Sequence, residues 1–166
     1  MFGPAARLAL NAIPVVHLAI VFEVGLWVFA GTPAFELTGM TRIVLGGLTV
    51  AGWFLLIVAL GKYNLGRFSG LAQLRAARAG EPSDDDEPLI VTGLHARVRH
   101  PLYSAAFLIL CGAAWNDLGL ATAVWGSLYL WVGSHFEECR LSRLHGDAYQ
   151  SYRRRVPAFV PWRPRA

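Results

Sequence analysis

The chain has 166 residues, of which 55% are hydrophobic and 16% are charged, and its formal net charge is +4. Soluble domains carry about 25% charged residues, so this composition argues against an ordinary soluble globule. The abundance of apolar residues excludes intrinsic disorder. Two cysteines cannot form a disulfide framework. The length fits a single domain that occupies residues 1–166.

Long uncharged stretches predict an all-α protein, an integral membrane helical bundle with a cytoplasmic helical C-terminal tail. About 20 apolar residues cross a bilayer as a helix. Residues 102–134 would measure about 50 Å as one helix, which is too long, and the Asn116-Asp117-Leu118-Gly119 cluster predicts a turn in their middle. We therefore expect about four transmembrane helices. The predicted spans are residues 8–29, 43–60, 102–115 and 118–134, with Pro101 favouring an earlier start of the third.

Basic residues indicate the orientation of these spans. Arg42 is the one residue among 15 lysines and arginines that falls on the far side of the predicted bundle. The positive-inside rule then places both termini and the 61–101 connection in the cytoplasm, as in a bacterial inner membrane protein. Topology and contact with anionic membrane lipids account for the basic surplus. No nucleic-acid-binding motif accompanies it, so no nucleic-acid partner is expected.

The segments outside the spans also carry structural signals. In the 61–101 connection, residues 71–79 are basic and rich in Ala, which predicts an interfacial helix. Residues 81–88 contain five acidic side chains and two prolines, which favours a solvated loop over a metal site. After span four the helix is expected to continue to a stop at Gly146. A short helix over residues 148–155 should follow and end before Pro157.

Ionisable residues gather at the predicted cytoplasmic ends of spans three and four. Because an antiparallel pair with a short turn brings these ends together, the side chains should meet at one membrane depth. They fit a functional site and an interfacial salt-bridge network that anchors the hairpin equally well. The residues are His95, Arg97, Arg99, His100 and Tyr103 at span three, and His135, Glu137, Glu138 and Arg140 after span four.

Other candidate sites are weaker. Glu23 and His17 in span one lie about 120° apart around the helix, so they do not share a face, and a role for either is left open. His135, Glu138 and Cys139 have a spacing that suits metal ligands. However, the chain contains no Cys-x-x-Cys or His-Glu-x-x-His motif, so we expect no metal. Gly-x-Ser-x-Gly and Gly-x-Gly-x-x-Gly motifs are also missing.

Three motifs, taken in chain order, resemble the core of the integral-membrane methyltransferases, the isoprenylcysteine carboxyl methyltransferase and phospholipid N-methyltransferase group. The first is LIVTGLHARVRHPLY at residues 89–103, and the second is Glu-Glu-x-x-Leu at residues 137–141. The third is Tyr-x-x-Tyr-x-x-x-Val-Pro at residues 149–157. The resemblance covers residues 61–162. Ala105 stands where the family usually has Gly.

The resemblance implies S-adenosylmethionine as methyl donor at the cytoplasmic membrane face, with a lipophilic acceptor that enters from the bilayer. It implies a cofactor pocket that includes His100, Tyr103, Glu137 and Glu138, with Tyr149 and Arg153 from the matching tail. On chemical grounds, a cation such as Arg99, His100 or Arg153 suits the carboxylate of the donor. A carboxylate or thiolate acceptor needs no strong base. For an amine acceptor, Glu138 or His135 is the candidate catalytic base.

Several alternatives stay open at this point. The acceptor is an isoprenylcysteine-like carboxylate, a lipid amine or a thiol. An NADPH-dependent membrane enzyme of the sterol-reductase type has a similar Arg-His-x-x-Tyr region. Such enzymes usually carry Asn before the tyrosine, and Leu102 disfavours them here. The third alternative is a non-catalytic membrane protein on the same scaffold.

Overall fold

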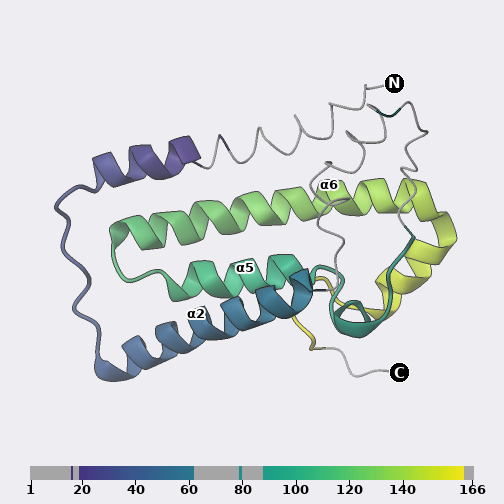
Figure 1. The fold of residues 1–166 in the computed structure, drawn as a ribbon, viewed down its shortest axis with the longest axis horizontal. Helices are drawn as coiled ribbons and strands as arrows, with labels where there is room; N and C mark the ends of the chain where they lie inside the picture. Colours follow the sequence, from purple (N-terminus) through teal and green to yellow (C-terminus); the bar gives the residue numbers. More distant parts are fainter. Residues whose placement is uncertain (1–15, 17–18, 62–78, 80–87, 163–166) are drawn as a thin grey trace. The chain divides into compact units, whose positions relative to one another are not determined.

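The structure is a computed structural model that describes residues 16, 19–61, 79 and 88–162. All regular elements in these residues are helical, as the sequence predicts (Figure 1). They are a helix at Ala19–Val28, α2 at Gly39–Leu60, the short 3₁₀ helix η1 at Gly93–Ala96, α5 at Pro101–Gly112 and α6 at Asp117–Arg155. The chain divides into two compact units, and Gly31–Gly61 with Leu89–Ala166 form the one that carries the predicted site.

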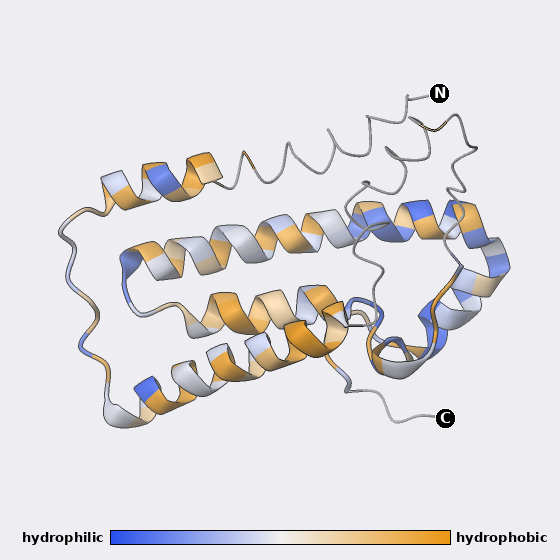
Figure 2. Ribbon diagram, in the orientation of Figure 1, coloured by the Kyte–Doolittle hydropathy of each residue, from blue (hydrophilic) through white to orange (hydrophobic). Residues whose placement is uncertain are grey.

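Helix α2 includes the whole of predicted span two. Among the described residues it is the one helix that is long and apolar enough to cross a membrane. Thr38 caps its first turn, since its hydroxyl accepts a hydrogen bond from the Thr41 amide at 3.3 Å. Ile43, Phe54 and Ile57 are each about two-thirds exposed or more. Apolar surface of this extent marks a site of contact with a membrane or another protein. Figure 2 shows that hydrophobic residues predominate along α2 and α5.

Helix α5 lies between α2 and α6 and contacts both (Figure 1). Glycines allow the α2 and α5 backbones to approach closely. A Cβ atom on Gly112 would lie 2.6 Å from the Thr49 amide nitrogen, and one on Gly52 would lie 2.8 Å from the Ile109 amide nitrogen. Small residues permit this kind of packing between membrane helices. The close contact fixes α5, whose first residue follows directly on His100.

The turn between α5 and α6 forms where the sequence predicts it. Asn116 caps α6 by accepting a hydrogen bond from the Gly119 amide at 2.8 Å. Pro101 begins α5, as expected from its fixed φ angle. The helix ends at Gly112, three residues before the predicted end of span three at residue 115. The chain needs residues 113–116 to reverse direction, which explains the earlier end.

Helix α6 is broken at Gly146, where φ is 49° and ψ is −126°. This confirms the predicted stop, because such a backbone conformation is open to glycine and strained for other residues. The helix resumes at once and ends at Arg155, before Pro157. The second segment folds back toward the first (yellow in Figure 1). The break therefore brings Arg153 within 3.3 Å of Glu138, fifteen positions earlier in the chain.

Several predictions concern residues that the structure describes only in part. Predicted span one is described at residue 16 and at 19–29, where Ala19–Val28 is helical and Glu23 is exposed. His17 lies outside the described residues. So do the predicted interfacial helix at 71–79, apart from Ala79, and the acidic segment at 81–88, apart from Pro88.

The Gly146→Ala substitution tests the break in α6. A side chain at positive φ strains the backbone, so we expect a loss of about 1–3 kcal/mol in the free energy of unfolding. Gly47→Ala is the matched control, because Gly47 lies within α2 and a Cβ atom there meets open space. Thermal unfolding in detergent measures both variants. Equal stability of the two would contradict the role assigned to Gly146.

Candidate active site

The residues directly before α5 pair with the tail that follows α6. The Arg99 amide donates to the Pro157 carbonyl at 2.9 Å, and the His100 amide donates to the Ala158 carbonyl at 3.0 Å. The Ser104 hydroxyl is 2.7 Å from the Phe159 carbonyl. We call residues 156–159 the tail strap. These backbone bonds hold the strap against the start of α5, so the motif arginine and histidine have fixed positions.

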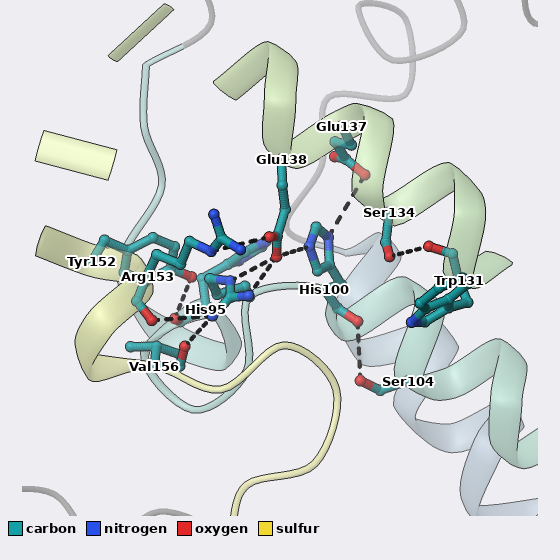
Figure 3. A network of polar contacts seen from close by, with 11 residues as sticks. His95, His100, Ser104, Trp131, Ser134, Glu137, Glu138, Tyr152, Arg153 and Val156 are labelled. Carbon is teal, nitrogen blue, oxygen red and sulfur yellow. Dashed lines mark hydrogen bonds and ion pairs between the residues drawn. The ribbon is translucent and has the colours of Figure 1, made fainter. Parts of the chain in front are cut away.

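Glu138 is the centre of a cluster of charged side chains (Figure 3). Its Oε1 atom accepts hydrogen bonds from Arg99 Nε at 3.0 Å and Arg99 Nη2 at 2.5 Å, and lies 3.1 Å from His100 Nε2. Its Oε2 atom is 3.3 Å from Arg153 Nε. The Glu138 side chain is 11% exposed. Three cationic or ionisable groups, two from the residues before α5 and one from the end of α6, therefore converge on one nearly buried carboxylate.

Arg99 has a structural position in this cluster. Its Nη1 atom donates to the Arg153 carbonyl at 3.1 Å and to the Val156 carbonyl at 2.6 Å. Together with its bonds to Glu138, these contacts occupy most of the five guanidinium N–H groups. Arg153 differs, because its side chain is 49% exposed and contacts Glu138 through Nε. Of the two arginines predicted to bind cofactor, Arg153 is the better placed to receive a ligand.

His100 is buried between Glu137 and the aromatic rings of Tyr103 and Phe159. Its Nδ1 atom is 3.6 Å from Glu137 Oε2, and the Glu137 side chain is 42% exposed. The Tyr103 ring lies edge-on to the imidazole at a centroid distance of 5.4 Å, and the Phe159 ring lies at 5.6 Å. The structure thus brings Tyr103, His100 and both glutamates together, as the motif spacing predicts.

The electrostatics of Glu138 bear on its predicted role as a base. Burial alone would raise the pKa of this carboxyl group, but hydrogen bonds from His100 and Arg99 and the charge of Arg99 lower it to about 2. A base works best when its pKa lies near the working pH. The ionised Glu138 carboxylate is therefore suited to bind a cationic group and poorly suited to accept a proton. His135, the other candidate base, is exposed and lies 3.9 Å from the Cys139 sulfur.

The two tyrosines of the third motif have different surroundings. The Tyr152 hydroxyl donates to the His95 carbonyl at 2.7 Å, which ties the end of α6 to η1. Tyr149 is fully buried, and its hydroxyl has no hydrogen-bond partner among the described residues. The rings lie edge-on, 6.0 Å apart. Burial and the nearby Glu138 carboxylate raise the pKa of Tyr149 to about 12, so its hydroxyl stays protonated.

Sequence reasoning did not find the contributions of Ser104 and of the strap carbonyls. The Val156-Pro157 step after Tyr152 marks the strap, but nothing in the sequence indicates that Arg99 would bind its carbonyl groups.

As for metals, no group of three or more His, Cys, Asp or Glu in the described part of the chain is arranged to hold an ion.

Comparison with known proteins supports the resemblance. The chain is 31% identical over 125 residues to methanethiol S-methyltransferase 1 of Bradyrhizobium diazoefficiens, which covers 73% of this chain and 42% of that protein. It is 29% identical over 129 residues to methanethiol S-methyltransferase of Crocosphaera subtropica, with 73% and 48% covered. It is 33% identical over 83 residues to protein-S-isoprenylcysteine O-methyltransferase of Schizosaccharomyces pombe, with 48% and 35% covered.

These relatives are methyltransferases, and at modest identity they point to the isoprenylcysteine carboxyl methyltransferase-like family of membrane proteins. The family is the one that the three motifs predict. The chain spans half or less of the length of the curated relatives it matches. No family profile matches the sequence, and no solved structure matches it.

The low pKa of Glu138 predicts a specific acid sensitivity. A carboxyl group whose pKa falls from 4.5 to about 2 on folding stabilises the protein above pH 4.5, and this contribution is lost as pH falls toward 2. Glu138→Gln should lower stability at neutral pH by about 3 kcal/mol, because it leaves the nearly buried Arg99 guanidinium without its counter-charge. It should also flatten the stability profile between pH 4.5 and 2.

Glu137→Gln is the matched control, since the neighbouring carboxylate is 42% exposed and its one ion pair spans 3.6 Å. Melting temperatures of both variants in detergent, measured from pH 2 to pH 7, provide the test. Glu138→Gln with the acid profile of the unaltered protein would show that Glu138 does not hold the cluster together.

Proposed function

We propose that this chain is an S-adenosylmethionine-dependent methyltransferase that acts on a lipophilic acceptor at the cytoplasmic face of a membrane. The observation that carries the proposal is the convergence of Glu137, Glu138, His100 and Arg153 beside a buried, unbonded tyrosine hydroxyl. The methyltransferase names of the relatives support the same reaction type. The lipophilic acceptor and the membrane lipids are its expected partners.

The residues present fit the chemical groups of the donor. S-adenosylmethionine carries a carboxylate, an ammonium group, two ribose hydroxyls, a sulfonium and an adenine. Arg153 is half exposed and suits the carboxylate, while Glu137 and Glu138 suit the ammonium group or the hydroxyls. The aromatic rings beside His100, including Tyr103, suit the sulfonium or the adenine. The unbonded Tyr149 hydroxyl supports a polar ligand in this place.

The site supports acceptors that react without a strong base. When bound, the donor supplies an electrophilic methyl group, and in-line positioning provides much of the rate of such a displacement. Glu138 is ionised at neutral pH, and its low pKa makes it a weak proton acceptor. We therefore assign Glu138 to binding and orientation, and we favour a thiolate or carboxylate acceptor over an amine.

The proposed topology has four spans, with both termini in the cytoplasm. α2 supplies one span. α5 has 12 residues and reaches about 18 Å, and we propose that it supplies a second, short span. The first half of α6 and the helix at Ala19–Val28 supply the other two. The site then lies where α6 changes from an apolar to a polar helix (Figure 2).

The test is methyl transfer and binding by the purified full chain. Native membrane extract incubated with the protein and methyl-labelled donor should yield a labelled lipophilic product. Thiol and carboxylate acceptors should react faster than amines. Titration calorimetry in detergent should show S-adenosylhomocysteine binding that Glu138→Gln or His100→Ala weakens at least about tenfold, because each removes a hydrogen-bonding group of the cluster.

Glu36→Gln is the matched control, since it makes the same charge change at an exposed residue before α2. It should leave binding unchanged. Quenching of NADPH fluorescence without binding of S-adenosylhomocysteine would favour the reductase alternative. Binding of S-adenosylhomocysteine with no labelled product from any acceptor class would favour a non-catalytic protein on this scaffold.

A further inference from the structure

The short helix at the end of α6 has a buried face and an exposed face. It comprises residues 147–155, which follow the break in α6. Tyr149 and Tyr152 are buried and lie on one side, three positions apart. Because successive residues are about 100° apart around a helix, Arg154 and Arg155 fall on the other side. Both of these arginines are exposed, so the outward face carries two adjacent cations that the charged cluster does not use.

Ser151 lies between the two arginines on this outward face. Arg154 Nη2 donates to the Ser151 hydroxyl at 3.2 Å, and Arg155 Nε donates to the Ser151 carbonyl at 3.2 Å. The two guanidinium groups therefore lie beside the same residue. An arginine side chain presents its N–H groups in a planar fork that matches a phosphate group, and a serine hydroxyl can also donate to one. We call Ser151, Arg154 and Arg155 the outer basic patch, and its chemistry suits a phosphate group.

The chain that follows this helix exposes large apolar side chains. Val160 is 55% exposed and Trp162 is 74% exposed, and they lie five and seven residues after Arg155. Tryptophan is enriched where a membrane meets water. Basic residues close to such a side chain are typical of segments that bind the surface of anionic phospholipids. The combination favours a phospholipid over a free phosphate ion, which would gain nothing from exposed apolar side chains.

The tail strap lies in the sequence between the outer basic patch and Trp162. The strap carbonyls of Pro157 and Ala158 accept hydrogen bonds from the amides of Arg99 and His100 at 2.9 Å and 3.0 Å. A segment that is held at the membrane before and after these bonds opens less often, because its ends have less freedom. Lipid contact on the outer face of the tail is therefore coupled to the backbone pairing that positions Arg99 and His100.

We propose that the outer basic patch and Trp162 form a docking surface for anionic phospholipids, and that lipid bound there holds the tail strap against the start of α5. The inference goes beyond the proposed function, since it rests on the proposed position of the site at a membrane surface and is independent of the reaction. The negative charge of the membrane then controls how firmly the strap positions His100.

Thermal unfolding of the full chain in lipid nanodiscs tests the docking surface. Nanodiscs of phosphatidylcholine are compared with nanodiscs made from equal parts of phosphatidylcholine and phosphatidylglycerol. The melting temperature should be higher in the anionic nanodiscs by about 4 °C or more, because each arginine near an anionic surface is stabilised there. Arg154→Gln combined with Arg155→Gln should remove most of this rise, and Trp162→Ala should remove part of it.

Arg140→Gln combined with Arg143→Gln is the matched control, since it makes the same charge change at exposed positions on the first segment of α6. It should keep the rise. An equal loss in both double variants would mean general attraction to charge and would overturn the inference, as would an unaltered protein that is equally stable in both lipids. Glycerol phosphate added to phosphatidylcholine nanodiscs should have no effect, and a rise of the same size would assign the patch to a free phosphate instead.

Hydrogen exchange tests the link between lipid and strap. The amides of Arg99 and His100 should exchange about fivefold more slowly, or slower still, in the anionic nanodiscs, and the change should be absent when Arg154 and Arg155 are both replaced by Gln. A higher melting temperature with unchanged exchange would overturn this link. None of these measurements uses the methyl donor. A protein that binds S-adenosylhomocysteine without any response to lipid would therefore contradict the inference alone, and one that responds to lipid without binding S-adenosylhomocysteine would contradict only the proposed function.

Discussion

The ionised carboxylate of Glu138 is the contact on which the rest of the site depends. It lies on the first segment of α6, and its cationic partners come from the stretch before α5 and from the short helix after Gly146. A buried carboxylate without partners would be costly, so these three segments stabilise one another. Because Arg99 also binds carbonyls of Arg153 and Val156, the same cluster fixes the tail strap.

This arrangement makes a polar site next to an apolar bundle. The glycine contacts between α2 and α5 fix the end of α5, and Gly146 turns the last helix back to meet it. Neither feature involves a catalytic group, yet both decide where His100, Glu138 and Arg153 lie. The apolar faces of α2, α5 and the first half of α6 suit a membrane, and the charged cluster suits a polar donor at the membrane surface. The proposed lipophilic acceptor and the proposed charged donor can then meet at the boundary between the two.

Much of this architecture could be predicted from the sequence because the signals are local. Pro101 starts a helix, Asn116 caps one and Gly146 ends one for reasons that lie within a few residues. The grouping of His100 with Glu137 and Glu138 follows from an antiparallel hairpin with a short turn. In these cases the distance along the chain, together with simple geometry, was sufficient.

Other features depend on contacts between residues that are far apart in the sequence, and these contacts could not be predicted from local sequence signals. The guanidinium of Arg99, a predicted cofactor-binding group, is directed to Glu138 and to carbonyl groups more than 50 positions away, and the sequence gives no sign of these contacts. Glu138 was considered as a base, and only the partners around it reveal how low its pKa is. The contrast between Tyr149 and Tyr152 is likewise a matter of packing, since the sequence places both on the same motif.

An experimental structure of the full chain in a lipid nanodisc with S-adenosylhomocysteine tests the central claim most directly. The account predicts one cluster at the membrane surface, in which Glu138 contacts Arg99 and His100 and the ligand lies against Arg153. A structure in which Glu138 is separated from Arg99 and His100, or in which the ligand binds elsewhere on the chain, would contradict it.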